Sequence, residues 1–455
     1  MNTVTAHPST RRGTELVLLI FAIAVVLLAY ANVGLAVDGA LPVDIIPMGI
    51  GFIAIAVTFH LVLRWKAAYA DPTLLPIATL LNGLGLVMIR RLDLNSSATN
   101  GLLEGSALRQ LIWSAVAVGA AITLLFVLPD HRRLRRYTFT FALAGIILLM
   151  MPLLPVIGRN INGNRIWIGL GPFSFQPSEL AKIAVTIFFA SYLVQTRDAL
   201  SLVGKRVLGL PLPRARDLGP IIGAWLASLA VLVFESDLGT SLLFFGVFVA
   251  MIYIATERRS WIIIGLTMFL VGCYTAYLLF AHFRVRVTLW LDPFTQGLSD
   301  QVAKGLMGMA SGGLTGTGLG QGHPEITYFA NSDYIIASFG EELGLVGLMA
   351  ILLLYGLFVE RGLRTALAAR DGFGKLLASG LAFSMALQCF VVIGGVTRVI
   401  PLTGLTTPFL AAGGSSLLAN WIIVALLLRI SDQARRPMFE SSAVADEMTQ
   451  VVKIR

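Results

Sequence analysis

The sequence is poor in charge and nearly free of cysteine. Only 13% of its 455 residues are charged, 56% are hydrophobic and the mean hydropathy is +0.82. Soluble domains carry roughly 25% charged residues, so this composition excludes an ordinary soluble enzyme. The two cysteines, Cys273 and Cys389, both fall in apolar segments, and we expect neither a disulfide nor a metal site from them. No cleavable signal is evident, because the first apolar run lacks a small-residue cleavage pattern.

A nucleotide-binding loop is also missing. The glycine-rich run 311–322 follows no predicted strand and does not end in Gly-Lys-Ser/Thr, so we interpret it as a tightly turned loop. The net charge of +9 does not indicate nucleic-acid binding, because the positive residues mark loops between apolar segments rather than one polar module.

Long apolar segments dominate the chain. Each is long enough, or nearly so, to cross a hydrocarbon core of roughly 30 Å. We therefore expect an all-α, polytopic membrane protein with about twelve transmembrane helices, an even number that puts both termini on one side. The expected spans are 15–37, 43–64, 72–91, 108–128, 137–157, 178–195, 219–235, 238–255, 261–281, 334–359, 376–397 and 408–430.

Basic residues predict the orientation of these spans. The main clusters all fall on the side of the termini, which the positive-inside rule makes the cytoplasm of a cell bounded by a plasma membrane. Two long loops, 158–177 and 282–333, then face outward, and loops of this length are usually functional or disordered. The clusters are 11–12, 132–136, 196–217, 361–364 and 435–436.

The most informative single position is an acid between two apolar segments. About forty residues separate Asp217 from Glu257, roughly 60 Å of helix or two crossings, and Asp237 lies at the tip of that hairpin. One interpretation is a tight turn with an acid favoured at a helix start. The other is a general base, since a partly desolvated carboxylate can accept a proton from a bound hydroxyl. Spacing alone leaves both open.

A lysine lies one turn inside the span that follows Gln176. Glu179 and Lys182 are an i, i+3 pair that could simply neutralise itself at an ordinary helix start. Alternatively, an ammonium in the membrane needs a partner or a cavity. A cavity lined by Lys182, Glu179 and Asp237 would suit an anionic, lipid-linked substrate.

Further charged residues fall on the expected outer side. The arginines there either contact phospholipid headgroups or clamp a pyrophosphate, for which arginine is well suited. Three acids at the outer end of the tenth span either bind a divalent cation or pair with those arginines. These arginines and acids are Arg159, Arg165, Arg284, Arg286, Asp333, Glu341 and Glu342.

Taken together, these segments resemble the SEDS family (shape, elongation, division and sporulation), which includes the RodA and FtsW peptidoglycan polymerases. The resemblance covers about 70–432 in order. One departure is that Ala411-Ala412 stand where the family has Ser-Tyr. The matching residues are Asn164–Ile168 with Phe175–Lys182, Ser236–Ser241, Arg284–Arg286 with Leu291–Pro293, Gly312–Gly322, Ser332–Tyr334 with Glu341–Gly347, and Gly413–Ser416.

The family core has ten spans, two fewer than we expect here, so the resemblance assigns the first two spans to an N-terminal extension. We expect a cytoplasmic tail over 1–14, a two-helix N-terminal extension over 15–71, a polymerase core over 72–432 that includes the outer loop 282–333, and a cytoplasmic tail over 433–455.

The resemblance implies an inverting glycosyltransferase that polymerises lipid II into glycan strands at the outer face of the plasma membrane. Asp237 would be its catalytic residue and take the proton of the acceptor hydroxyl, while the donor is a glycan on undecaprenyl pyrophosphate. No cofactor is firmly implied, although a divalent cation, Mg²⁺ or Mn²⁺, is one way to offset the charge of the leaving pyrophosphate. The implied substrate-binding residues are Arg165, Trp167, Gln176, Glu179, Lys182, Arg284, Arg286, Asp333, Glu341 and Glu342.

The implied partners are lipid II, membrane lipids and a class B penicillin-binding protein, a transpeptidase. The absence of a long Pro-rich cytoplasmic tail favours a role in cell elongation and shape over one in division. Two other classes remain as alternatives. One is a transporter that flips lipid II, although the charged residues gather at the outer end rather than at the midplane. The other is a non-catalytic scaffold that recruits the transpeptidase.

Overall fold

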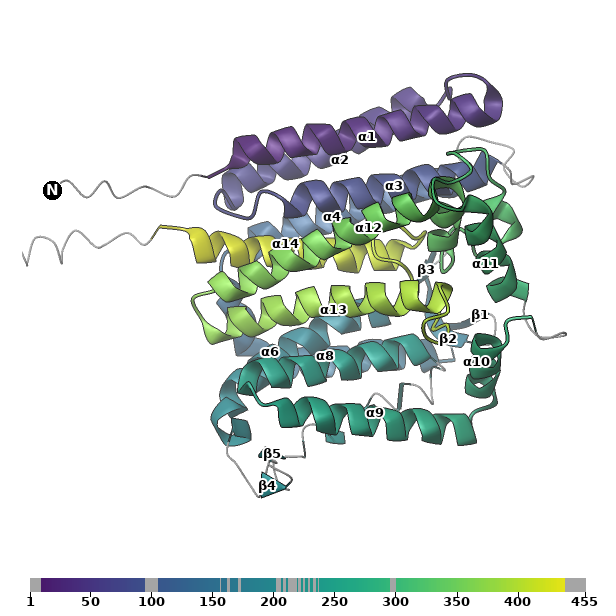
Figure 1. Cartoon of the computed structure of the whole chain (residues 1–455). Helices are drawn as coiled ribbons and strands as arrows, with labels where there is room; N and C mark the ends of the chain where they lie inside the picture. Colours follow the sequence, from purple (N-terminus) through teal and green to yellow (C-terminus); the bar gives the residue numbers. More distant parts are fainter. Residues whose placement is uncertain are drawn as a thin grey trace, which may run out of the picture.

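The computed structural model of this protein is almost entirely helical (Figure 1). Eleven helices in the described part of the chain are long and apolar enough to cross a membrane, which confirms the predicted all-α, polytopic class. Eleven of the twelve predicted spans correspond to them, and most of the twelfth, 219–235, lies outside the described residues. The structure describes residues 10–94, 105–155, 157–161, 164–170, 173–201, 206–207, 210–211, 219, 222–223, 226–227, 230–231, 235, 237–294 and 300–437.

The spanning helices follow the apolar segments closely, because a segment in hydrocarbon must satisfy its backbone hydrogen bonds internally. Helix α5 is extended by the flanking 3-10 turns η1 and η2. The helices are α1 (Arg12–Asp38), α2 (Ile45–Lys66), α3 (Leu74–Leu94), α4 (Ser106–Val127), η1 (His131–Tyr137), α5 (Thr138–Met150), η2 (Met151–Leu153), α6 (Ser178–Ser201), α8 (Leu238–Thr256), α9 (Arg259–Leu279), α12 (Ile335–Ala368), α13 (Gly372–Val396) and α14 (Gly414–Arg435).

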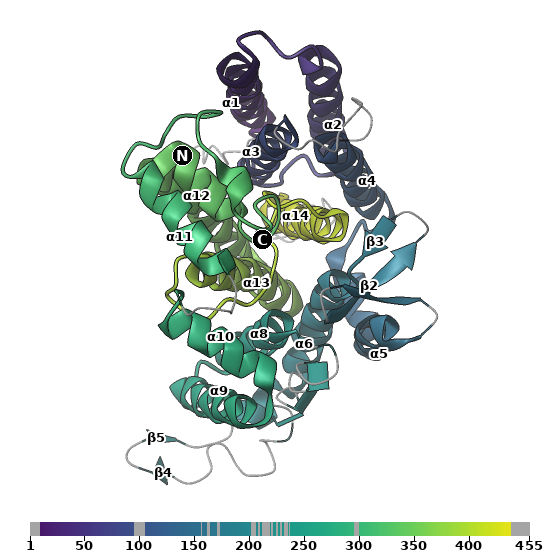
Figure 2. The same cartoon turned by 90° about the vertical axis from the view of Figure 1, so that its right-hand side faces the viewer.

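Helix α14 occupies the middle of the bundle and is its most buried span (Figure 2). It packs mainly on α4 and α12, while α13 joins α12 to α6 and α8. The first two helices flank the bundle at one edge, α1 against α3 and α2 against α4. The core is therefore built from helices distant in sequence.

Ion pairs gather near the start of α1 and the end of α14, two helix ends that lie on the same side of the bundle in Figure 1. Arg12 pairs with Glu15 and donates to the carbonyl of Ala70. Asp71 accepts from Arg435 at 2.5 Å. The start of the first helix and the end of the last helix therefore lie at the same end of the bundle.

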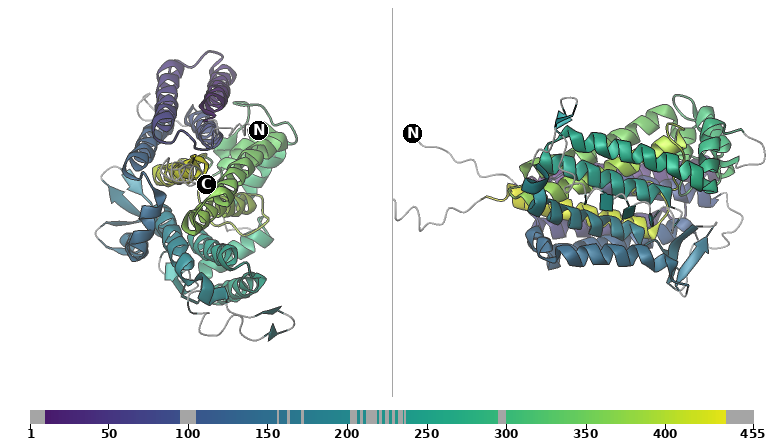
Figure 3. Two further views of the ribbon diagram at one scale, coloured as in Figure 1. Left: turned by 90° about the vertical axis from the view of Figure 1, so that its left-hand side faces the viewer. Right: turned by 90° about the horizontal axis from the view of Figure 1, so that it is seen from below.

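The opposite end of the bundle holds the two long loops, and both contain regular structure (Figure 3). The first forms an antiparallel sheet in the order β1-β2-β3, with Arg159 opposite Trp167. The signal for it is the dipeptide Asn162-Gly163, a favoured hairpin-turn sequence. The second loop contains two helices and the short turn η4. These elements are β1 (Gly158–Ile161), β2 (Asn164–Leu170), β3 (Phe173–Phe175), α10 (Ala281–Leu291), α11 (Asp300–Gly312) and η4 (Pro324–Ile326); a separate short hairpin consists of β4 (Arg206–Val207) and β5 (Leu210–Pro211).

The glycine-rich loop 313–322 is bound to a kink in α12. Gly344 has φ 64° and ψ −168°, which breaks the helix, and a side chain there would meet the backbone of the loop. The amides of Leu345 and Val346 donate to carbonyls of the loop, and the amides of Thr317 and Gly318 donate to carbonyls of α12. The loop is therefore an integral part of the first turns of α12.

Candidate active site

Asp237 is the N-cap of α8. Its carboxylate accepts from the amide of Thr240 at 2.9 Å and from the hydroxyl of the same residue at 2.6 Å, and it is 6% exposed. The helix-start interpretation from the sequence is therefore confirmed. A role as N-cap does not exclude a role as general base, because the same carboxylate faces a cavity.

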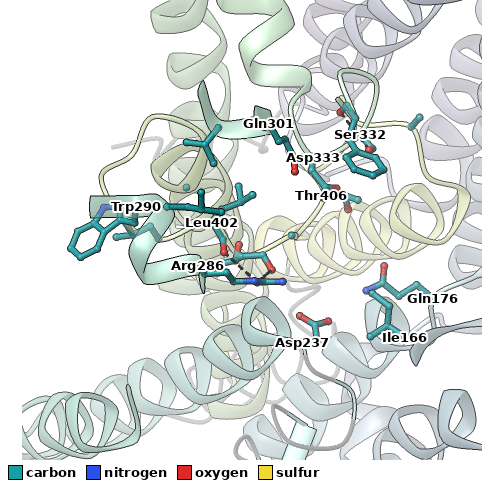
Figure 4. Close-up of a pocket in the computed structure, with 18 of the residues that line it drawn as sticks. Ile166, Gln176, Asp237, Arg286, Trp290, Gln301, Ser332, Asp333, Leu402 and Thr406 are labelled. Atoms are coloured by element: carbon teal, nitrogen blue, oxygen red, sulfur yellow. Dashed lines mark hydrogen bonds between the residues drawn. The ribbon is translucent and has the colours of Figure 1, made fainter. Parts of the chain in front are cut away.

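That cavity has a volume of about 440 Å³ and lies at the end of the bundle that holds the sheet and α10 (Figure 4). Asp237 forms its floor and β2 one wall, α10 and α11 form another, and the segments before α12 and before α14 complete the lining. Ligand pockets of this size bind small molecules or parts of larger ones. Its polar and charged lining residues are Trp167, Ser174, Gln176, Asp237, Arg286, Trp290, Gln301, Ser332, Asp333, Arg398, Thr403 and Thr406.

Arg286 extends from α10 toward Asp237 (Figure 4). Its guanidinium donates to the carbonyls of Leu402 at 3.2 Å and Thr403 at 2.8 Å, which fixes it over the cavity. Asp333, just before α12, lines the same cavity. Two acids therefore face one arginine there.

The pKa values of both acids depart from ordinary carboxyl values. Both residues precede their spanning helices. Burial raises the pKa of Asp237, and the hydrogen bonds from Thr240 and the charge of Arg286 oppose that rise. Burial raises the pKa of Asp333 to about 7, again opposed by Arg286. Perturbed carboxyl groups in a cleft are typical of functional sites.

Glu179 and Lys182 lie beside the cavity without lining it. The Lys182 ammonium donates to Glu179 at 2.8 Å and to the side-chain oxygen of Gln388 on α13 at 2.8 Å. Gln388 in turn donates to the carbonyl of Thr406, whose hydroxyl bonds Ser416 on α14. This buried network joins α6, α13 and α14 directly behind the cavity wall, and direct substrate contact by Glu179 or Lys182 stays a prediction.

Glu341 and Glu342 lie outside the cavity and hold the glycine-rich loop. Glu342 pairs with Arg91 of α3 at 2.8 Å and accepts from the amide of Gly320 at 3.0 Å. Glu341 accepts from the amide of His323 at 2.6 Å. Glu342 therefore pairs with an arginine that the sequence did not single out, and substrate contact by these two acids stays a prediction.

Several predicted arginines are also away from the cavity. Arg159 and Arg165 on the sheet and Arg284 on α10 have exposed side chains and do not line it. Trp167, Gln176, Arg286 and Asp333 do line it, together with Asp237. The structure thus brings together five of the eleven residues predicted to be catalytic or substrate-binding.

Sequence reasoning did not predict the other seven polar lining residues, which include three large side chains, those of Trp290, Gln301 and Arg398. The Trp290 indole donates to the carbonyl of Arg398 at 3.0 Å, and the Arg398 guanidinium donates back to the carbonyl of Trp290 at 2.8 Å. This reciprocal pair ties α10 to the loop before α14. Only Arg398 carried a signal in the sequence, an arginine on the expected outer side, which is also what identified Arg286.

A second, apolar groove adjoins the cavity. It has a volume of about 550 Å³ and runs between α8, α9, α10 and α13, with Cys273 in its wall. Trp290, Ile400 and Thr403 line both spaces, so the groove reaches the polar cavity.

Neither space has an evident metal centre. In the part of the chain that the structure describes, no three His, Cys, Asp or Glu side chains converge on one point. Mg²⁺, however, is usually held by one or two carboxylates together with substrate phosphates. Asp237 and Asp333 could supply the one or two carboxylates that such a site needs.

Residues 71–436 match the model of the FtsW/RodA/SpoVE family, described as a cell cycle protein. The chain therefore belongs to this family, and the resemblance seen in the sequence is confirmed. This chain is 50% identical over 438 residues to the peptidoglycan glycosyltransferase RodA of Mycobacterium tuberculosis. The match covers 96% of this chain and 93% of that relative.

Solved structures share the fold. A chain from a peptidoglycan synthase complex that coordinates polymerization and crosslinking is 28% identical with a TM-score of 0.63, covering 80% of this chain and 98% of that one. The rod shape determining protein RodA of Thermus thermophilus is 25% identical with a TM-score of 0.58, covering 82% and 99%.

The buried pair Lys182–Glu179 generates a stability prediction. We expect Lys182→Met to destabilise the protein by about 3–5 kcal/mol, because it leaves a buried carboxylate unpaired, and we expect the double variant with Glu179→Gln to be milder. Thermal unfolding of the purified variants measures this. The exposed pair Arg364–Glu360 is the control, where Arg364→Met should cost no more than about 1 kcal/mol. A double variant less stable than both single variants would contradict a simple ion pair.

Proposed function

We propose that this protein is a peptidoglycan glycosyltransferase that polymerises lipid II, with Asp237 as its general base. The observation that carries the proposal is a buried carboxylate facing an arginine in a polar cavity that opens into an apolar groove. Such a site suits a substrate with a charged, sugar-bearing head and a polyprenyl tail. The name of the mycobacterial relative supports the same activity.

In the proposed reaction, the acceptor hydroxyl oxygen attacks the anomeric carbon of the donor glycan. A new glycosidic bond forms as the bond from that carbon to the pyrophosphate oxygen breaks, and undecaprenyl pyrophosphate leaves with the electron pair. The acceptor proton passes to Asp237, so one base is sufficient for a single inverting displacement.

The leaving pyrophosphate needs positive charge near the cavity. Arg286 and Arg398 both line it, and bidentate arginines suit phosphate oxygens. Asp333 lies nearby, and its raised pKa lets it hold a proton, which lowers the repulsion of an anion. Alternatively, a divalent cation bound by ionised Asp333 and the donor pyrophosphate would supply the positive charge, and Asp333 would then carry no proton.

The groove provides a place for a polyprenyl tail. Its lining is almost wholly apolar, and it meets the cavity at Trp290, Ile400 and Thr403. A tail in the groove would position the attached pyrophosphate beside Arg286. A flippase would instead place its polar site near the midplane, whereas here the charged cavity lies where α8 and α12 begin.

The proposed location is the plasma membrane, with both termini in the cytoplasm and the cavity at the outer face. We also propose a class B penicillin-binding protein as partner, which the similarity to a chain from a peptidoglycan synthase complex supports. Elongation and shape maintenance are the proposed cellular role, with division as the alternative. A scaffold without activity would tolerate loss of Asp237 as long as it still bound its partner.

We expect Asp237→Asn to reduce lipid II polymerisation by about 10²- to 10⁴-fold, because it removes the base. The fold should be little affected, since Asn caps a helix start about as well as Asp. Product lengths from labelled lipid II, together with thermal unfolding, measure the two effects. Thr240→Val, which removes one hydrogen bond to Asp237 but leaves its carboxylate, is the matched control. Wild-type product lengths from Asp237→Asn would refute the assignment of the base.

The pH dependence follows from the same carboxylate. A general base works only when ionised, so a raised pKa means that the rate falls as the pH is lowered through that value. Because Arg286 favours the ionised form, Arg286→Met should move this acidic limb to higher pH, whereas Arg286→Lys should move it less. Polymerisation rates between about pH 4 and 9 test this. An acidic limb at the same pH in Arg286→Met would argue against a titrating carboxylate beside this arginine.

Cysteine labelling tests the orientation. Ser311→Cys, on the exposed end of α11, should react with a membrane-impermeant maleimide in intact cells, and Arg370→Cys, between α12 and α13, only after permeabilisation. The native cysteines are a low background, because Cys389 is buried and Cys273 faces the apolar groove. The reverse pattern would place the cavity in the cytoplasm.

A further inference from the structure

The first two helices lie outside the family match, which begins at residue 71. They are nevertheless folded into the protein. Glu15 of α1 is completely buried and accepts from Arg12, while His60 of α2 approaches its other oxygen at 2.7 Å. Arg12 also donates to the carbonyl of Ala70. Buried charges paired in this way fix a helix hairpin in place, which a simple membrane anchor does not need.

A second set of polar contacts fixes the other end of this hairpin. The Tyr30 hydroxyl on α1 donates to Asp44, just before α2, at 2.9 Å. Arg90 of α3 forms an ion pair with the same carboxylate oxygen at 2.9 Å. The end of α1 that lies toward the cavity is thus tied to α3, one helix of the family core.

This end of α1 contacts the glycine-rich loop. A side chain at Gly320, which has φ +84°, would meet the Cβ of Ala36 at 2.8 Å and the carbonyl of Val33 at 3.3 Å. The loop backbone therefore lies directly on α1 (Figure 2). On its other side, the amide of Gly320 donates to Glu342, and Arg91 bridges Glu342 and the carbonyl of Gly322 at 2.6 Å.

The same loop directly follows α11, which forms part of the cavity wall. Gln301 and Val302 of α11 line the cavity. A side chain at Gly305 would meet the ring of Tyr334 at 2.5 Å, so α11 packs on the residue next to Asp333. A displaced loop would therefore move both α11 and the segment that carries Asp333.

We propose that the N-terminal hairpin is a positioning element of the transferase: Val33 and Ala36 of α1 form the seat that holds the glycine-rich loop, and through it α11 and Asp333, at the cavity. This inference rests on the proposed function for its effect on activity. Its effect on the loop can be measured without any substrate.

The test is a series at Ala36 in the full chain, with valine, leucine and phenylalanine in order of size. Hydrogen exchange of peptides over 313–322 reports the loop, because Thr317, Gly318 and Gly320 donate their amides to α12. Overpacking the seat should raise exchange with side-chain size, by about tenfold for Ala36→Phe, and lower kcat for lipid II polymerisation in parallel. Leu35→Phe is the matched control, because Leu35 is 50% exposed on the same turn.

We expect the global unfolding midpoint and the exchange of α13 to stay at wild-type values, which separates positioning from a general loss of stability. If Ala36→Phe does not fold, Ala36→Val supplies the same comparison. Unchanged loop exchange across the series, or faster exchange with undiminished kcat, would overturn the proposal. A wild-type protein without polymerase activity would instead refute the proposed function, and the exchange data would still test the seat.

Discussion

Charged and polar side chains inside an apolar bundle are tolerated only when another protein group pairs with them, and this requirement organises the molecule. Lys182 is buried beside Glu179 and Gln388, so α6 must lie against α13. Arg91 is buried against Glu342, which joins α3 to α12. Because the contacts of Lys182 with Gln388 and of Arg91 with Glu342 connect helices that are distant in sequence, they select one arrangement among the many in which apolar helices could pack.

In the cavity, unlike in those buried ion pairs, the charges are not fully paired. Two carboxylates, Asp237 and Asp333, face the guanidinium of Arg286, and Arg398 also lines the cavity. One arginine between two acids compensates them incompletely, and burial then raises the pKa of both. A basic carboxylate and a second acid that retains its proton are suited to remove a proton beside a pyrophosphate without repelling it strongly.

Much of the cavity wall consists of α10, α11 and the loop before α14, which are held in place by contacts with one another and with the spanning helices. Helix α10 is tied to the loop before α14 by Arg286 and by the reciprocal bonds of Trp290 and Arg398. Helix α11 continues into the glycine-rich loop, which lies between the kink of α12 and the end of α1. The N-terminal hairpin thus lies at the back of the same assembly that presents Asp333 to the cavity.

Local properties of the chain were sufficient to predict the spans, because helix length in hydrocarbon depends only on a continuous apolar run. They also marked Asp237, Arg286 and Asp333 as candidates, since an acid or an arginine at the end of a span stands out against its apolar neighbours. The resemblance to a known family added Trp167 and Gln176. In contrast, the sequence contains nothing that separates Arg286 from Arg284, two residues away. The turn of α10 decides this, by directing one guanidinium into the cavity and leaving the other exposed. Likewise, only packing decides that Glu342 meets Arg91, because a contact between residues 251 positions apart depends on how the helices assemble and not on any local pattern.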